Sequence, residues 1–162
     1  MRMVIRAAED ADRERVRALV VEHWGGPIVV SRERVHAPDA LPGLIAELDG
    51  RIAGLATFRI DGLECELVTL NSFVDDAGCG TLLVERVADA ARRAGCKRLW
   101  LITTNDNTGA LRFYQKRGFQ LVAVHRGAVD KARTLKPQIP LTGIDGIPIR
   151  DEIELELMLG SG

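Results

Sequence analysis

The chain has 162 residues and a mass of 17.7 kDa, and a composition of 46% hydrophobic and 28% charged residues is typical of one globular domain. Its 22 basic and 23 acidic residues form no long run of either sign, so the charge indicates neither a nucleic-acid partner nor a membrane surface. No apolar run approaches the roughly 20 residues of a membrane span, and the N-terminus lacks a signal-peptide segment, so we expect a cytoplasmic protein. The three cysteines lack C-x-x-C spacing, so we expect reduced thiols and no metal.

Residues 4–7 form a short apolar stretch, and the segment after them carries apolar residues with the period of a helix. The first elements are therefore a strand and an amphipathic helix. Over residues 24–42 this periodicity fails and Gly and Pro interrupt the chain, so we expect an irregular arm with a short helix around residues 32–35. Trp24 and His36 could line a substrate pocket, although Trp24 could equally anchor the core.

Residues 43–48 and 52–60 flank Asp49 and Gly50, a pair that suits the positive φ angles of a type I′ turn. They are typical of a hairpin, and residues 63–74 follow as a third strand. The three strands predict an antiparallel meander.

Residues 75–80 form a short turn into a helix that opens at Thr81. Gly78 and Gly80 let the backbone approach a ligand without a Cβ in the way, and the first amides of a helix have no internal acceptor. These N–H groups and the positive end of the helix suit a phosphate or pyrophosphate, although the turn could also be only a tight connection. Cys79 could be a nucleophile because a helix N-terminus lowers the pKa of a thiol, but no partner His is evident, and we interpret it as a small loop residue.

The apolar residues 97–104 suit a strand that is buried on both faces and lies parallel to residues 63–74, because a helix connects the two. Asn107 or Thr108 can cap a further helix. The last two strands are expected over residues 120–125 and 152–159, with a helix over 128–135 and a long loop between them.

This order of elements resembles the GNAT superfamily of acyl-CoA-dependent N-acetyltransferases over nearly the whole chain. Residues 75–80 occupy the place of the family's pyrophosphate loop, usually Gln/Arg-x-x-Gly-x-Gly/Ala, and residues 107–119 resemble its more specific signature N-x-x-A-x-x-F-Y-x-x-x-G-F. We therefore expect an α/β (α+β) fold in a single domain over residues 1–159, followed by a disordered tail, residues 160–162. The resemblance implies a mixed, mostly antiparallel sheet of six to seven strands, flanked by helices, whose central parallel pair splays to hold acyl-CoA.

The turn departs from the family pattern at Asp75, where the family usually has Arg or Gln, and Asp76 adds a second negative charge beside the pyrophosphate. The pyrophosphate is then left to the backbone amides of Gly78, Cys79, Gly80 and Thr81. Lys116 or Arg112 could add positive charge. The strength of cofactor binding therefore depends on side chains that the sequence does not locate.

By the same resemblance, the pantetheine arm of acetyl-CoA pairs with the backbone of the diverging strands like an added strand. The other cofactor-binding residues that the family pattern implies are Leu70, Asn71, Ser72, Asn107, Ala110, Phe113, Tyr114 and Lys116. Asn107 is also suited to capping its helix, and the two roles are compatible.

Tyr114, the only Tyr in the chain, matches the family position of the acid that protonates the leaving thiolate, although it could also serve only to pack the core. Glu64 and Glu66 lie on one face of their strand because side chains alternate. Glu66 lies four residues before Leu70, the spacing at which some members of the superfamily place a general base. Glu64 or water could take that role instead.

The sequence therefore predicts acetyl transfer from acetyl-CoA to a primary amine of a small molecule or peptide, by direct attack in a ternary complex without a metal. No nucleic-acid or membrane partner is expected, and a homodimer is compatible with the pattern. Residues 24–42 and 126–150 are candidate walls for the acceptor, which the sequence does not name. The alternative is an inactive acyl-CoA-binding sensor, but Tyr114 and Glu66 favour the enzyme. A dinucleotide oxidoreductase fits poorly because the glycine turn follows a meander.

Overall fold

The computed structural model describes residues 2–74 and 78–160. Asp75 and Asp76, the acidic residues of the predicted pyrophosphate loop, lie outside the described residues, as do Ser161 and Gly162 of the expected tail. The described residues form, in chain order, β1 (Met3–Ala7), η1 (Asp10–Asp12), α1 (Arg13–Trp24), β2 (Val29–Ser31), β3 (Arg34–His36), η2 (Pro38–Ala40), β4 (Gly43–Leu48), β5 (Arg51–Asp61), β6 (Glu64–Ser72), α2 (Cys79–Arg93), β7 (Arg98–Thr104), α3 (Thr108–Lys116), β8 (Gln120–His125), α4 (Ala128–Leu135), η3 (Ile144–Gly146) and β9 (Glu152–Met158).

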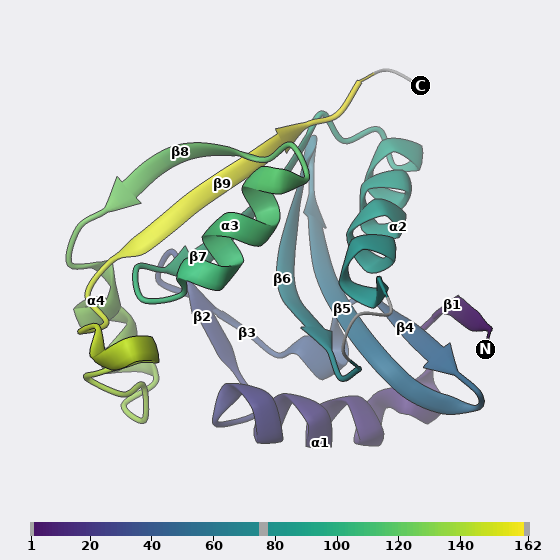
Figure 1. Cartoon of the computed structure of the whole chain (residues 1–162), viewed down its shortest axis with the longest axis horizontal. Helices are drawn as coiled ribbons and strands as arrows, with labels where there is room; N and C mark the ends of the chain where they lie inside the picture. The colour runs from purple at the N-terminus through teal and green to yellow at the C-terminus, as the bar shows by residue number, and fades with distance from the viewer. Residues whose placement is uncertain (1, 75–77, 161–162) are drawn as a thin grey trace.

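The main sheet has seven strands in the order β1-β4-β5-β6-β7-β9-β8 (Figure 1). Its only parallel pair among the described strands is β6 with β7, and the other neighbours are antiparallel. This confirms the expected mixed, mostly antiparallel sheet and its meander. Asp49 and Gly50 have φ angles of 52° and 79°, as a type I′ turn requires.

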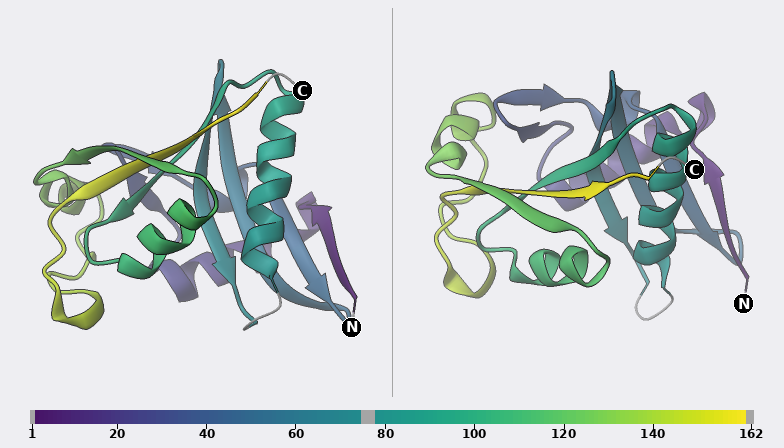
Figure 2. Two further views of the ribbon diagram at one scale, coloured as in Figure 1. Left: turned by 45° about the horizontal axis from the view of Figure 1, so that its top comes forward. Right: turned by 90° about the horizontal axis from the view of Figure 1, so that it is seen from above.

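Helices cover both faces of the sheet (Figure 2). On one face, α2 and α3 pack over the central strands and enclose the larger hydrophobic core, which includes Leu83, Leu99 and Tyr114. On the other face, α1 places Val16 and Val20 in a second core. The sheet therefore separates two layers, each with apolar contacts of its own.

The strands β6 and β7 separate from one another partway along their length. Their register runs from Glu64 opposite Arg98 to Glu66 opposite Trp100, and no described pair continues it. A bulge in β6 lies just beyond this point, because Thr57 and Phe58 on β5 face Thr69 and Leu67, which leaves Val68 between them. A bulge bends its strand and increases the local twist, so the extra residue helps β6 to leave β7. The predicted splayed parallel pair is thereby accounted for in the backbone.

The short helix expected around residues 32–35 is wrong, because β2 and β3 form a two-stranded antiparallel hairpin there. Its turn residues Arg32 and Glu33 have positive φ angles of 49° and 62°. Arg and Glu seldom adopt this conformation, and strands of three residues are too short for an alternating pattern to show. The arm is therefore ordered by contacts with other segments, which its own sequence does not predict.

Two further expectations need correction. Helix α2 begins at Cys79 rather than at Thr81, because Gly78 takes a left-handed φ of 70° and is itself the N-cap. Strand β7 is not buried on both faces: Leu99 and Leu101 are buried in the core, whereas Arg98 and Trp100 on the other face are only half-buried. An arginine on that face requires carboxylate partners, which come from the neighbouring strands.

Candidate active site

Two adjoining hollows lie where β6 and β7 diverge, with α3 as their common wall. One lies toward the glycine turn and is lined by Leu70, Ser72, Gly80, Gly109, Ala110, Phe113 and Tyr114. The other lies between the diverging strands and is lined by Trp24, Leu67, Val68, Leu70, Leu101, Ile102, Thr103, Asn107, Ala110 and Tyr114. Since Leu70, Ala110 and Tyr114 line both, the hollows form one groove that runs along β6. Seven residues that the sequence predicted as a cofactor site lie on this groove: Leu70, Ser72, Gly80, Asn107, Ala110, Phe113 and Tyr114.

The first turn of α2 closes one end of this groove. The first hydrogen bond of the helix runs from the Leu82 amide to the Gly78 carbonyl, at 3.1 Å, so the amides of Cys79 to Thr81 precede the helical ladder. A Cβ added at Gly80 would lie 3.2 Å from the Phe113 ring, which packs directly on the helix backbone. The glycine therefore serves the packing of α3 against α2 and also keeps the turn open. Cys79 is buried, its thiol lies 3.5 Å from the Ala53 carbonyl, and burial raises its pKa, which argues against a nucleophilic role.

Arg117 is a residue that sequence reasoning missed. Its Nε donates to the Thr81 hydroxyl at 2.8 Å, its Nη1 donates to the Phe113 carbonyl at 2.8 Å, and its guanidinium lies 3.6 Å from the centroid of the Phe113 ring. Lys116 and Arg112, the cations that the sequence suggested, are exposed. A single basic residue from the end of α3 is thus held against the first turn of α2, where an anion would meet the helix.

Tyr114 lies on α3, where its side chain packs in the core and also lines the groove. It is 8% exposed, and its ring makes edge contacts with Phe113 and Phe119 at centroid distances of 5.1 and 5.3 Å. Its hydroxyl forms no hydrogen bond with any described side chain or backbone group. Burial raises the pKa of the phenol well above its usual value of about 10, so the hydroxyl stays protonated. The packing role and a proton-donor role are both open to it.

Glu66 is buried at the point where β6 and β7 part. It is 4% exposed; the Ser31 hydroxyl donates to its Oε2 at 2.5 Å, and His36 Nε2 lies 3.6 Å from its Oε1. Burial is the largest influence on this carboxyl and raises its pKa, while the Ser31 hydrogen bond opposes that change. Glu66 does not line either hollow, but Leu67, the next residue, does. His36, which the sequence suggested for a pocket wall, is instead buried beside Glu66, and Ser31 gave no signal in the sequence.

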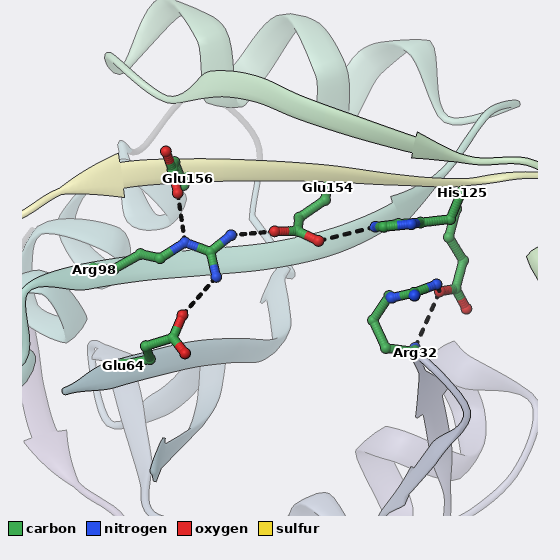
Figure 3. Close-up of polar contacts among 7 residues, drawn as sticks. Arg32, Glu64, Arg98, His125, Glu154 and Glu156 are labelled. Atoms are coloured by element: carbon green, nitrogen blue, oxygen red, sulfur yellow. Dashed lines mark hydrogen bonds and ion pairs between the residues drawn. The ribbon is translucent and has the colours of Figure 1, made fainter. Parts of the chain in front are cut away.

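Glu64, the other carboxylate of the predicted pair, belongs to a separate network around Arg98 (Figure 3). Arg98 donates to Glu64 at 2.7 Å and to Glu156 at 2.5 Å, and it also pairs with Glu154. His125 lies 2.9 Å from the same Glu154 carboxylate. Since Glu64 is half-exposed and already paired with a cation, it is a weaker candidate for a base than Glu66.

The predicted Asn residues have partners in the described chain. Asn71 accepts a hydrogen bond from Trp24 Nε1 at 2.8 Å, which ties the end of α1 to β6. Asn107 caps α3 by accepting from the Ala110 amide at 3.1 Å, so the capping role expected for it is present. Leu70 and Ser72 pair with β5 on one side only. The other backbone edge of this part of β6 faces the groove.

The two irregular segments that were expected as acceptor walls meet one another. Lys136, at the end of α4, is 6% exposed and donates from Nζ to the carbonyls of Trp24 and Ile28, at 2.5 and 2.8 Å. The Arg32 amide donates to Glu152 Oε1 on β9 at 3.0 Å. These contacts fix the arm against the sheet. In the described ranges no helix is long and apolar enough to span a membrane, and no three His, Cys, Asp or Glu residues are grouped to hold a metal.

The groove, the glycine turn and the α3 signature together define an acyltransferase of the GNAT type. A sequence profile of the acetyltransferase (GNAT) family matches residues 3–119, and the chain therefore belongs to this family. It is 47% identical over 133 residues to the uncharacterized protein YdhI of Bacillus subtilis, covering 82% of this chain and 83% of that protein. It is 41% identical over 144 residues to YxbD of the same organism, also uncharacterized, with coverage of 88% and 91%.

Solved structures support the fold. The IAA acetyltransferase from Bacillus cereus matches with a TM-score of 0.75 at 18% identity, over 98% of this chain and all of that one. The yncA protein of Salmonella typhimurium, solved with its cofactor acetyl-CoA, matches with a TM-score of 0.68 at 21% identity, over 100% of this chain and 96% of that one. At identities this low the two matches show agreement of the fold alone.

Proposed function

We propose that the protein transfers the acetyl group of acetyl-CoA to a primary amine by direct attack in a ternary complex. The observation that carries this proposal is the groove between β6 and β7, which is walled by α3 and closed by the first turn of α2. The yncA structure, with acetyl-CoA as its cofactor, supports the choice of acyl donor. The edge of β6 from Leu67 to Ser72 offers backbone groups to the amides of pantetheine.

The pyrophosphate would lie on the first turn of α2. The amides of Gly78, Cys79, Gly80 and Thr81 supply donors at the positive end of a helix of fifteen residues. Arg117, held on Thr81 and Phe113, supplies positive charge beside these amides, and Lys116 adds charge nearby. The family usually has Arg or Gln in this loop, where this chain has Asp75. We propose that Arg117 takes the role of that residue.

The proposed chemistry uses two groups, Tyr114 as the acid and Glu66 as the base. A neutral amine attacks the thioester carbonyl, the tetrahedral intermediate collapses, and the thiolate leaves with a proton from the Tyr114 hydroxyl. The raised pKa of Tyr114 keeps this donor protonated at neutral pH. Before the attack, Glu66 takes one proton from the ammonium form of the amine, directly or through a water. The proton that the nitrogen loses as the amide forms reprotonates the Tyr114 oxygen through solvent. Neither Glu64 nor Cys79 has a part in this scheme.

Two measurements test the proposal. Acetyl-CoA should raise the melting temperature by mass action, and an amine panel with mass-spectrometric detection should yield an acetylated product. Gly80→Asp should abolish the thermal shift, because it adds a negative charge at the proposed phosphate site and a Cβ that would lie 3.2 Å from the Phe113 ring. A thermal shift without any product would point to the acyl-CoA-binding sensor instead. A wild-type protein that neither binds acetyl-CoA nor transfers its acetyl group would overturn the proposal.

A further inference from the structure

Three buried polar side chains meet behind the point where β6 and β7 part. Ser31 from β2 and His36 from β3 contact Glu66 from β6, and the three residues are 5%, 2% and 4% exposed. The Ser31 hydroxyl oxygen lies 2.5 Å from Glu66 Oε2 and 2.9 Å from His36 Nε2. The β2–β3 hairpin is a sheet of its own, so these two polar groups reach the carboxyl from outside the main sheet.

The single proton of the Ser31 hydroxyl fixes the direction of the hydrogen bonds. An ionised Glu66 can only accept, so Ser31 donates to Oε2, and the Ser31 oxygen in turn accepts from His36, which must carry its proton on Nε2. Burial, and then the charges of Arg59 and Arg34, lower the pKa of His36 to about 4, so its ring is neutral at pH 7. The result is a chain of donors from His36 through Ser31 to the carboxylate, in which each bond strengthens the next.

The other ring nitrogen of His36 argues against a purely structural role, because it lowers the stability of the fold. His36 Nδ1 is a buried side-chain atom without a hydrogen-bond partner among the described residues. An unpaired buried acceptor destabilises the fold, and an apolar side chain at this position would avoid that cost. The chain thus retains a buried imidazole whose one hydrogen bond leads to the Glu66 carboxyl.

The two oxygens of the Glu66 carboxylate differ. Oε2 accepts from Ser31, whereas Oε1 receives no hydrogen bond from the described residues, and His36 Nε2 lies 3.6 Å from it. Leu67 lines the groove immediately after Glu66 along β6. One oxygen is therefore held from the hairpin side, and the other accepts no hydrogen bond from the described residues.

Building on the proposed function, we infer that Ser31 and His36 are positioning residues for Glu66. Through Oε2 they fix the carboxylate and favour its ionised form, so that Oε1 can accept a proton from the acceptor amine. In this step an N–H bond of the ammonium breaks, its electron pair stays on nitrogen, and the proton forms a new O–H bond on Glu66. The neutral amine can then attack the thioester.

Other charges act on Glu66 from three elements. Arg34 on β3 and Arg59 on β5 favour its ionised form, whereas Glu152 on β9 and the burial of the carboxyl oppose it. Replacing Ser31 or His36 changes none of these residues. A change in the pKa of Glu66 in such a variant then reports the effect of the Ser31 hydroxyl or of the His36 imidazole on the carboxyl.

The direct test is a carbon-13 NMR titration of the Glu66 carboxyl, assigned with Glu66→Gln. Ser31→Ala removes a hydrogen bond to a charged group, so we expect the pKa of Glu66 to rise by about 1 to 2. Ser31→Thr keeps a hydroxyl and should restore most of the wild-type value. His36→Leu acts through Ser31 and should give a smaller rise, which also keeps the test open if Ser31→Ala does not fold.

Thr57→Val is the matched control, because it also removes a buried hydroxyl, one that lies 2.6 Å from Thr69 Oγ1. It should leave the pKa of Glu66 unchanged. With an amine from the panel, the acid limb of kcat/KM should move to higher pH in Ser31→Ala by the same amount as the NMR value. An unchanged Glu66 pKa in folded Ser31→Ala and His36→Leu would overturn the inference, as would a shifted pKa with an unshifted acid limb. Failure of the proposed function would look different, since the wild type itself would then transfer no acetyl group.

Discussion

The hydroxyl of Tyr114 provides the sharpest test of the proposed mechanism, because Tyr114→Phe removes one oxygen and keeps the ring. The ring contacts with Phe113 and Phe119, at 5.1 and 5.3 Å, remain available to Phe. The hydroxyl makes no hydrogen bond within the described chain, so its removal leaves no described donor or acceptor unpaired. We therefore expect the free energy of unfolding to change by less than about 1 kcal/mol.

The effect on rate should be much larger. A positioned acid contributes about 10²- to 10⁴-fold, which corresponds to about 3 to 5 kcal/mol in the activation free energy. We expect kcat to fall by this factor while the Kd for acetyl-CoA changes little, because the groove loses only one oxygen atom. The loss appears only if thiolate departure limits the rate, so single-turnover acetyl transfer with an amine from the panel is the right assay.

The refuting result follows from the same assay. If Tyr114→Phe is folded, binds acetyl-CoA as the wild type does and transfers acetyl at the wild-type single-turnover rate, Tyr114 is a packing residue and solvent protonates the thiolate. Tyr114→Ala is the comparison for lost packing. It removes the ring contacts and should cost about 3 to 5 kcal/mol of stability, which Tyr114→Phe must not do.

Three further predictions concern the cofactor, the core and pH. Arg117→Met should weaken acetyl-CoA about 10-fold by calorimetry and leave S-acetylpantetheine, which lacks the phosphates, unchanged; equal losses for both ligands would mean that Arg117 only packs. Gly54→Ala should cost about 1 to 3 kcal/mol in urea unfolding, because its Cβ would lie 2.4 Å from a buried thiol, whereas Gly109→Ala, with nothing closer than 3.9 Å, should not destabilise. Because the pKa of His36 falls from about 6.5 to about 4 on folding, the unfolded state binds the extra proton in this range, so His36 lowers stability as pH falls from 6.5 to 4. His36→Gln should remove that part of the pH dependence. Plots of the free energy of unfolding against pH that stay parallel for the wild type and the variant would refute this prediction.

The sequence predicted the elements whose signals are long or specific. The meander from β4 to β6 has long strands and an Asp-Gly turn, and α3 carries a signature with fixed spacing, so their places and the groove residues Leu70, Ala110 and Tyr114 follow from the sequence. The seven-stranded, mostly antiparallel sheet with a parallel pair also agrees with the expected six to seven strands. In these parts local preference and tertiary packing favour the same structure.

The missed features depend on contacts between segments far apart in the chain. Ser31 and Glu66 are 35 residues apart, and the turn that brings Ser31 into place uses Arg32 and Glu33 in a conformation that their side chains disfavour. The sequence suggests Lys116 rather than Arg117 as the cation near the pyrophosphate. The two are neighbours, but successive side chains of a helix point about 100° apart, so they face different surroundings. Arg117 lies four residues after Phe113 and shares its face toward α2, and that orientation depends on how α3 packs.

The arm and the loop after α4 act as one unit on the side of the sheet opposite α2. The buried Lys136 ammonium binds the carbonyls of Trp24 and Ile28, and the Trp24 indole donates to Asn71 on β6. Burial lowers the pKa of Lys136, and the two carbonyls accept best from its charged form. Since Asn71 lies on the strand whose edge is proposed to hold pantetheine, the proposed acceptor wall and the proposed cofactor groove share one element. Changes in the loop beyond Lys136 can therefore reach the proposed acceptor wall through the Lys136 contacts, and reach β6 through the hydrogen bond between Trp24 and Asn71.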